Sequence, residues 1–223
     1  MKDQLLVTIA ILGGTGKEGK GLAYRWARAG YKVIIGSRTP EKAVAAAADV
    51  AEMLGDSAIA GLDNLSAAQK ADIVVLTVPY AAHRETLIGL KDALQGKILV
   101  DVTVPLVPPK VTKVQMPAAG SAAQEAVEIL GEGVQVVDAF QNISYEHLMA
   151  AGETPCDVLV TGTSKAAREE VLKLVEAAGL TGWDAGPIEN SVVVEGLTSI
   201  LIYMNKQYGS THAGIKMTGV RQY

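Results

Sequence analysis

The chain has 223 residues, of which 49% are hydrophobic, and a formal net charge of −4. This length fits one ordinary domain, or a large domain with a small annex. The weak acidity argues against a nucleic-acid binder, and no apolar run approaches the roughly 18 residues of a membrane span. Because Cys156 is the only cysteine, an intramolecular disulfide and a cysteine-based metal cluster are both excluded.

The first predicted element is a buried strand in the apolar run from Leu5 to Leu12, which is rich in β-forming residues. No small-residue cleavage site follows this run, and a glycine cluster ends it. We therefore interpret it as part of the fold rather than as a signal peptide, and we expect a cytoplasmic protein.

Strand-like and helix-like patterns then alternate along the chain. Further strands are predicted at 32–36, 59–62, 72–78, 97–103, 134–140 and 157–161, with a last strand near Asp184. Helices are predicted at 22–29, 43–54, 81–94, 121–130, 164–178 and 189–208. The alternation predicts an α/β fold of the Rossmann type, a doubly wound and mostly parallel sheet with a small C-terminal helical annex. We place a dinucleotide-binding domain at 1–140 and a smaller C-terminal subdomain at 141–223.

The proline-rich stretch from Pro105 to Pro117 is the longest predicted loop. Loops of this length are often functional lids, although a plain crossover connection explains the pattern equally well.

The glycines Gly14, Gly16 and Gly19 form a Gly-x-Gly-x-x-Gly pattern between the first strand and the first helix. Glycine allows a sharp turn and a close approach to a pyrophosphate, while the helix N-terminus offers free N–H groups. A second strand follows, as a βαβ unit requires. This context favours dinucleotide binding over a structural glycine turn.

The end of the second predicted strand carries Ser37 and Arg38 and no acidic residue. Enzymes that use NAD usually have an Asp or Glu there to hold the ribose 2′-hydroxyl. The guanidinium of Arg38, the hydroxyl of Ser37 and the nearby Lys42 suit a 2′-phosphate instead. The pattern therefore favours NADP, the alternative being a solvated basic loop.

Catalytic side chains of familiar kinds are missing. No tyrosine has a lysine four residues on, and no spacing suggests a metal site. His83, His147 and His212 have no visible acidic partner, and we expect each to lie at the surface or half-buried. The length after the last strand leaves no room for a helical catalytic domain, so a second ligand would bind at the sheet's own edge. Hydride transfer between two cofactors requires little more than alignment.

The chain resembles the NADPH-dependent deazaflavin oxidoreductases, which pass a hydride between NADP and the 8-hydroxy-5-deazaflavin coenzyme F420. The matching segments are Gly13-Gly14-Thr15-Gly16, Gly19 to Ala23, Gly36-Ser37-Arg38, Thr77-Val78-Pro79, Asp184 to Pro187 and Gly214-Ile215-Lys216. One departure is Lys17-Glu18, because an apolar residue before Gly19 is common in that family. A second is the longer, proline-richer segment from Pro105 to Gln124.

The resemblance implies NADP(H) and F420 as the two small-molecule partners, a homodimer, and no covalent catalyst. Implied pyrophosphate contacts lie in the turn and first helix, at Gly14, Thr15, Gly16, Lys17 and Glu18. Because a carboxylate is repelled by a pyrophosphate, we expect the Glu18 side chain itself to face solvent, where Lys17 and Lys20 partly neutralise it. Implied 2′-phosphate contacts are Ser37, Arg38 and Lys42, and implied nicotinamide contacts are Val78, Val104 and Ala139. The deazaflavin crevice is expected from Pro79, Pro105, Phe140, Gln141 and Asn142, although the last two fit an ordinary strand-end polar pair equally well. Lys206, Lys216 and Arg221 are candidates to meet the coenzyme's charged tail, the alternative being a solvated basic C-terminus.

Two other functions fit the same sequence. One is an NADPH-dependent flavin or metal-chelate reductase, and the other is a non-enzymatic NADP-binding sensor. The strand-end group Phe140-Gln141-Asn142 speaks against a sensor, which needs no acceptor crevice.

Overall fold

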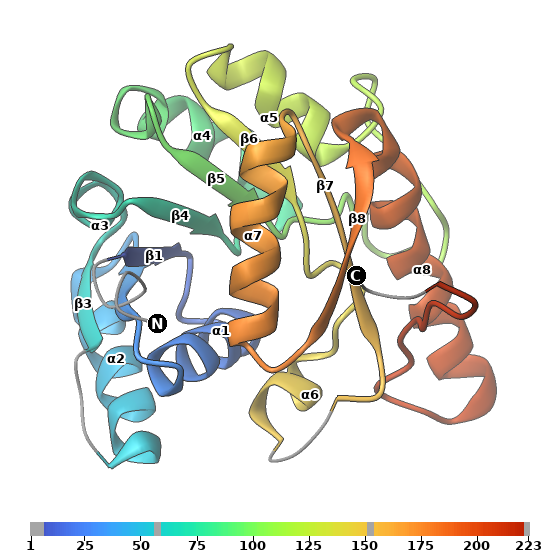
Figure 1. Ribbon diagram of the computed structural model, residues 1–223, viewed down its shortest axis with the longest axis horizontal. Coiled ribbons are helices and arrows are strands. Elements are labelled where there is room, and N and C mark those ends of the chain that lie inside the picture. Colours follow the sequence, from blue (N-terminus) through green and yellow to red (C-terminus); the bar gives the residue numbers. More distant parts are fainter. Residues whose placement is uncertain (1–6, 56–58, 151–153, 221–223) are drawn as a thin grey trace.

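A computed structural model describes residues 7–55, 59–150 and 154–220. Strands and helices alternate through this part of the chain (Figure 1). The strands are β1 (Thr8–Leu12), β2 (Lys32–Ser37), β3 (Ile59–Asp63), β4 (Ile73–Leu76), β5 (Ile98–Asp101), β6 (Gln135–Asp138), β7 (Asp157–Gly162) and β8 (Thr181–Pro187). The helices are α1 (Lys17–Arg28), α2 (Pro40–Leu54), α3 (Asn64–Lys70), α4 (Tyr80–Leu94), α5 (Ala122–Leu130), α6 (Tyr145–Met149), α7 (Lys165–Ala177) and α8 (Ser191–Tyr208), the last preceded by a 3-10 turn, Ile188–Asn190.

The strands form one eight-stranded sheet in the order β3-β2-β1-β4-β5-β6-β7-β8. All neighbouring pairs are parallel except β6 and β7, which are antiparallel. The predicted fold class is confirmed, since the sheet is mostly parallel and its order turns at β1 as in a doubly wound fold. The direction of β7 was not predicted, because hydrophobic periodicity carries no information on strand direction.

Side chains alternate between the two faces of the sheet, as the pleat requires. In β1, Ile9 and Ile11 pack in a core under α1, α2 and α7, whereas Ala10 and Leu12 pack with α3, α4 and α5. Residues of β1 are fully buried from Ile9 on, which explains its continuous apolar run. Both faces are therefore covered by helices (Figure 1).

Two short helices, α3 and α6, were not predicted from the sequence. Helix α3 begins at Asn64, where the Asp63 carboxylate caps it by accepting from the Ser66 N–H at 2.8 Å. Helix α6 lies in the connection from β6 to β7, just after the predicted boundary at residue 140. Segments this short have too few residues to show a helical period.

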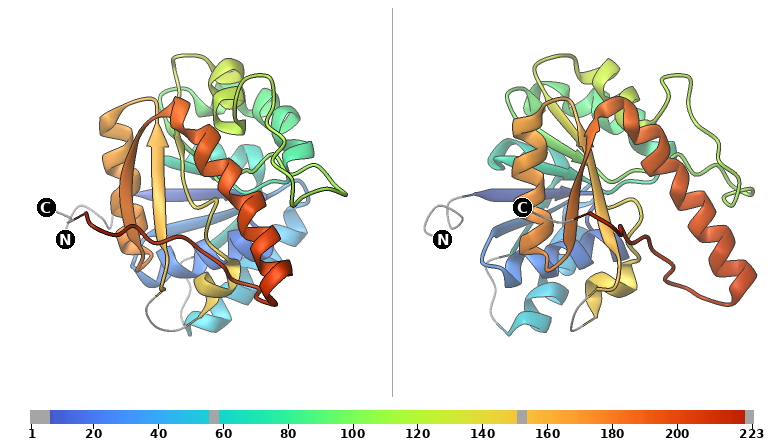
Figure 2. Two further views of the ribbon diagram at one scale, coloured as in Figure 1. Left: turned by 90° about the vertical axis from the view of Figure 1, so that its right-hand side faces the viewer. Right: turned by 45° about the vertical axis from the view of Figure 1, so that its right-hand side comes forward.

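Helix α8 extends along one side of the molecule and projects beyond the sheet (Figure 2). The segment 102–121, between β5 and α5, forms no helix or strand and is the long loop that the prolines predicted. None of the helices in the described ranges is long and apolar enough to cross a bilayer.

Candidate functional site

The turn after β1 depends on its glycines. The N–H of Gly14 donates to the Gly36 carbonyl at 3.1 Å, which joins the turn to β2. A Cβ on Gly14 would lie 2.6 Å from the Ile11 carbonyl oxygen, and a Cβ on Gly19 would lie 2.5 Å from Gly14 Cα. Only glycine permits this close packing of strand end and helix.

Gly16 differs, because no atom lies within 4 Å of the Cβ position it lacks. Gly16 is the N-cap of α1, and no side chain caps the helix there. The first N–H groups of α1 therefore face open space, which is the arrangement that binds phosphate at a helix N-terminus. This cradle fits the pyrophosphate of a dinucleotide.

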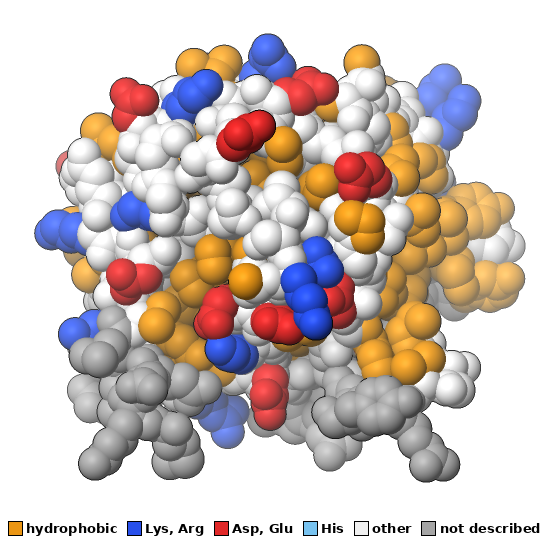
Figure 3. Space-filling model, turned by 45° about the horizontal axis from the view of Figure 1, so that its top comes forward, with side chains coloured by type: hydrophobic (Ala, Val, Ile, Leu, Met, Phe, Trp, Pro, Cys, Tyr) orange, Lys and Arg blue, Asp and Glu red, His pale blue; other side chains and the backbone are white. Residues whose placement is uncertain are grey.

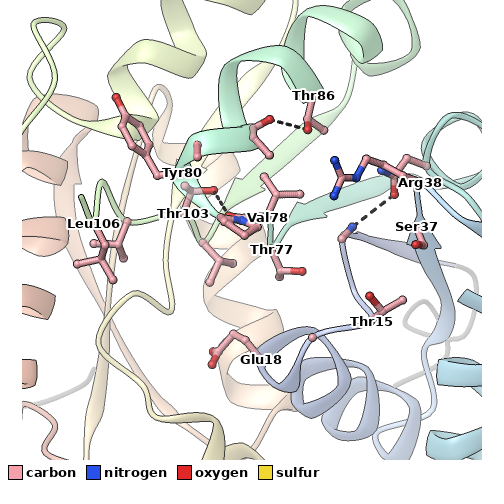
Figure 4. A pocket seen from close by; sticks show the side chains of 18 of the residues that line it. Thr15, Glu18, Ser37, Arg38, Thr77, Val78, Tyr80, Thr86, Thr103 and Leu106 are labelled. Carbon is pink, nitrogen blue, oxygen red and sulfur yellow. Dashed lines mark hydrogen bonds between the residues drawn. The ribbon is translucent and has the colours of Figure 1, made fainter. Parts of the chain in front are cut away.

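A cleft of about 740 Å³ opens at the carboxyl ends of the central strands (Figure 4). Its walls come from the glycine turn, the end of β2, the start of α4 and the loop after β5. Lining residues include Gly13, Thr15, Gly16, Glu18, Ser37, Arg38, Thr39, Lys42, Asn64, Thr77, Val78, Pro79, Tyr80, Thr86, Thr103, Val104, Leu106, Pro108 and Val111. A second pocket of about 360 Å³ adjoins the Ser37–Arg38 end and also includes Asn64 and Thr86.

One end of this cleft carries positive charge. Arg38 and Lys42 are exposed there, and the Ser37 hydroxyl accepts from the Thr39 N–H at 3.2 Å. Both cations and Ser37 line the same cleft as Thr15, so the turn and the predicted 2′-phosphate residues face a common space.

Of the residues singled out from the sequence, Thr15, Gly16, Glu18, Ser37, Arg38, Lys42, Val78 and Val104 line the cleft. Gly14 is buried beneath it. The Lys17 ammonium instead donates to the Tyr145 hydroxyl at 3.0 Å and lies 4.4 Å from that ring's centroid. Ala139 is fully buried in the core and does not appear in the cleft wall.

Glu18 was expected to face solvent, and this expectation is wrong. Its carboxyl group lies in the cleft wall, and its buried Oε1 atom has no hydrogen-bond partner among the described residues. Burial raises the pKa of Glu18 to about 8. One feature of the sequence does point to an inward-facing side chain at position 18. An apolar residue is common there in the family that the chain resembles, and apolar positions usually face inward.

The group Phe140-Gln141-Asn142 lies below the cleft rather than in it. Phe140, in a left-handed backbone conformation with φ 75°, packs edge-on against Trp26 with ring centroids 5.7 Å apart. The Gln141 amide donates to the Asp101 carbonyl at 2.6 Å, and the Asn142 amide donates to the Val194 carbonyl at 3.0 Å. These amides join β5 and α8 to the sheet end, so the expectation that they face the crevice is not met.

The buried pair His83–Asp101 was missed in the sequence. His83 was expected at the surface or half-buried, yet it is fully buried and its Nε2 lies 2.6 Å from Asp101 Oδ2. Burial lowers the pKa of His83, but the carboxyl groups of Asp101, Glu125 and Glu195 together outweigh it, and the net pKa is raised. The two residues are 18 positions apart in different elements, so no sequence pattern links them.

His83 and Asp101 touch the cleft through their neighbours. Asp101 Oδ1 accepts from the Thr103 N–H at 3.0 Å, and Tyr80 stacks on His83 with ring centroids 6.0 Å apart. The Tyr80 hydroxyl donates to Glu125 at 3.2 Å. Because Thr103 and Tyr80 line the cleft, the buried pair supports its floor.

The remaining predictions concern two histidines and the basic residues near the C-terminus. His147 is half-buried and His212 is exposed, as expected. Lys206 and Lys216 are exposed outside the cleft wall, and Arg221 lies outside the described residues. No cluster of three or more His, Cys, Asp or Glu side chains suited to a metal ion occurs within the described ranges.

Known proteins resemble this chain over most of its length. Residues 8–105 match the family model "NADP oxidoreductase coenzyme F420-dependent". The F420-dependent NADP reductase of Methanothermobacter thermautotrophicus is 39% identical over 97% of both chains. A solved structure from Arthrobacter sp. FB24, provisionally described as an F420-dependent NADP reductase, superposes with a TM-score of 0.79 at 25% identity, covering 95% of this chain and 99% of its own. The metalloreductase STEAP3 of Rattus norvegicus is 28% identical over 82% of this chain but 35% of its own length.

Proposed function

Because the chain belongs to the family of F420-dependent NADP reductases, we propose that it transfers a hydride between NADP(H) and coenzyme F420. The observation that supports this most strongly is the single cleft that joins the open helix N-terminus at Gly16 to the cationic pair Arg38 and Lys42. The same cleft continues past Val78 to an apolar wall at Leu106, where an acceptor ring would lie.

In this proposal the turn holds the pyrophosphate of NADP(H). The free N–H groups at the start of α1 and the Thr15 hydroxyl donate to its oxygens, and Gly14 keeps the turn tight. Lys17 and Glu18 contribute N–H groups through the backbone. Ser37, Arg38 and Lys42 bind the 2′-phosphate, and the adjoining pocket beside Asn64 and Thr86 receives the adenine.

The reactive rings meet over the ends of the central strands. Val78 and Val104 line the cleft there, and they hold the nicotinamide by apolar contact. When bound, the two coenzymes supply the hydride chemistry, between nicotinamide C4 and deazaflavin C5. The protein's share is to align the rings and to exclude water, and no side chain forms a covalent bond.

Residues 141–223, with the loop after β5, would complete the acceptor side of the cleft. Leu106, Pro108 and Val111 of that loop already line it. The subdomain's α8 contacts the dinucleotide-binding domain through Glu195, whose carboxyl group accepts from the Ala122 N–H at 2.7 Å.

We also propose that the protein is cytoplasmic and forms a homodimer. Large apolar side chains are exposed along α8, where hydrophobic atoms gather at one side of the surface (Figure 3). Val193 is 62% exposed, Ile200 47% and Tyr203 53%, which is unusual for a helix that faces water. Light scattering should give twice the chain mass for the native protein and the single mass for Ile200→Glu.

Isotope transfer tests the hydride step. Two samples of NADPH, each with deuterium on one face of C4, are mixed separately with oxidised F420 and the protein. Mass spectrometry then measures the mass of the reduced deazaflavin. Direct transfer predicts one deuterium from one labelled face and none from the other. Loss of the label to solvent from both faces would contradict direct transfer.

A metal-chelate reductase is the second candidate, supported by the similarity to a metalloreductase over 82% of this chain. Such an activity would need electrons to pass from NADPH to a flavin or to ferric iron. Comparing F420, flavin mononucleotide and a ferric chelate as acceptors separates the two enzymes. A sensor would bind NADPH and turn over none of the three.

A further inference from the structure

Hydride transfer from NADPH to a deazaflavin requires a proton as well, because the reduced ring gains one hydrogen at carbon and one at nitrogen. We propose, on the basis of the function proposed above, that Glu18 is the acid that supplies this proton and takes it back in the reverse reaction.

The position of the Glu18 side chain supports this role. The side chain extends from the first turn of α1 into the cleft, and Oε1 is buried without a hydrogen-bond partner in the described structure. In Figure 4, Thr15 lies between Glu18 and the pair Ser37 and Arg38, so Glu18 is on the side of the cleft away from Arg38. A dinucleotide with its 2′-phosphate at Arg38 and its pyrophosphate at Thr15 would therefore bring its nicotinamide end toward Glu18.

No other ionisable side chain in the described lining of the cleft is as well suited as Glu18 to donate this proton. The other ionisable side chains in the described lining are Arg38, Lys42 and Tyr80. Tyr80 is held by Glu125, and burial together with that carboxylate raises the Tyr80 pKa to about 12, too high for an efficient acid at neutral pH. His83 Nε2 donates to the Asp101 carboxylate beneath the floor, and His83 does not line the cleft.

No cation neutralises the Glu18 carboxylate within the described structure. Lys17 is held by Tyr145 of α6, close to Glu146, and Lys20 pairs with Asp49 of α2 at 2.7 Å. The pKa of Glu18 is raised by burial alone to about 8, with no charged neighbour contributing. A general acid works best with a pKa near the working pH, which is the range that this burial gives. A pyrophosphate bound at the same turn would favour the neutral carboxyl further.

The step balances. The C4–H bond of NADPH breaks, and its hydrogen moves with both electrons to form the C5–H bond of the deazaflavin. The O–H bond of Glu18 breaks, its proton forms an N–H bond on a ring nitrogen of the deazaflavin, and the electron pair stays on the carboxylate. Glu18 then regains a proton from water. In the reverse direction the carboxylate accepts the ring proton.

Substitution of Glu18 by Gln keeps the size and polarity but removes the proton. We expect Glu18→Gln to lower kcat for F420 reduction by about 100-fold, the lower end for a general acid. In the native protein this kcat should fall as pH rises through about 8, and kcat for NADP+ reduction should rise over the same range. Both slopes should be absent in Glu18→Gln and retained in Glu41→Gln, a control at an exposed glutamate of α2.

A binding measurement tests the same group without turnover. Calorimetry of NADP+ binding in two buffers of different ionisation enthalpy should show uptake of about half a proton near pH 8 by the native protein. Glu18→Gln and Glu18→Leu should show none, and Glu41→Gln should match the native protein. The second variant guards against misfolding. If a partly buried amide at position 18 destabilises the fold, the apolar leucine of Glu18→Leu still leaves a folded protein without the carboxyl group.

The outcomes separate the two proposals. Native turnover of F420 with unchanged rate and pH slopes in Glu18→Gln, or equal proton uptake, would overturn the role of Glu18 and leave the proposed function standing. Failure of the native protein to reduce F420 would overturn both.

Discussion

His83 Nε2 lies 2.6 Å from Asp101 Oδ2, and both side chains are fully buried under the cleft. Asp101 also accepts from the Thr103 N–H, so the pair fixes the backbone where β5 enters the loop that lines the cleft. A buried carboxylate is tolerated because these partners compensate for its lost hydration.

Removing His83 should therefore destabilise the protein strongly. His83→Ala leaves Asp101 as an unpaired buried charge, at a cost of about 3–5 kcal/mol in the free energy of unfolding. Denaturant unfolding measures this directly, with Lys91→Ala, an exposed position on the same helix, as the control. A loss below about 1 kcal/mol, the scale of an exposed ion pair, would show that the pair does not hold the floor.

Stability should fall as the pH rises from about 4.5 to about 8. Burial raises the pKa of Glu195 to about 8, against 4.5 for an ordinary glutamate. The native state therefore binds more protons than the unfolded state between these values, and the free energy of unfolding decreases as pH rises through that window. The raised pKa of His83 acts in the same direction, because its stabilisation is lost as pH rises through the folded pKa.

Glu195→Gln isolates the contribution of that carboxyl group. Melting temperatures between pH 5 and 9 should decline less in this variant than in the native protein, because an amide has no proton to lose in this range. The substitution also alters the contact to the Ala122 and Ala123 N–H groups, so the slope with pH, rather than the melting temperature at one pH, is the quantity compared. An identical decline in both proteins would assign the pH dependence to other groups.

Arg38 should set the preference for NADPH over NADH. A charge-assisted hydrogen bond to phosphate contributes about 1.5–3 kcal/mol, so Arg38→Ala should lower kcat/KM for NADPH by roughly 10- to 100-fold. The value for NADH, which has no 2′-phosphate, should change little. Arg28→Ala, at an exposed position in the last turn of α1, is the control. Equal losses for both nicotinamides would contradict a 2′-phosphate role.

Gly19 should be essential for dinucleotide binding. An added methyl group would lie 2.5 Å from Gly14 Cα, so Gly19→Ala must push α1 away from the turn. We expect the affinity for NADP+ to fall at least about tenfold, which calorimetry measures, while the circular dichroism spectrum shows a folded protein. Retained affinity would mean that the turn adapts without moving its N–H groups.

Much of the fold and the NADP end of the site could be predicted from local sequence. Gly14, Ser37 and Arg38 lie at or just after strand ends, and Gly19 lies in the first turn of the helix that follows, so chain order alone brings them to one edge of the sheet. The acceptor end could not be predicted in the same way. His83 and Asp101 meet only through packing, and Phe140 turns below the cleft because its left-handed backbone directs the ring onto Trp26.

The most direct test of the proposed function is the absorbance of oxidised F420 during mixing with NADPH and the native protein. Hydride transfer predicts that the deazaflavin absorbance disappears with one equivalent of NADPH consumed per F420, and more slowly with NADH. Turnover of flavin mononucleotide without any turnover of F420 would contradict it.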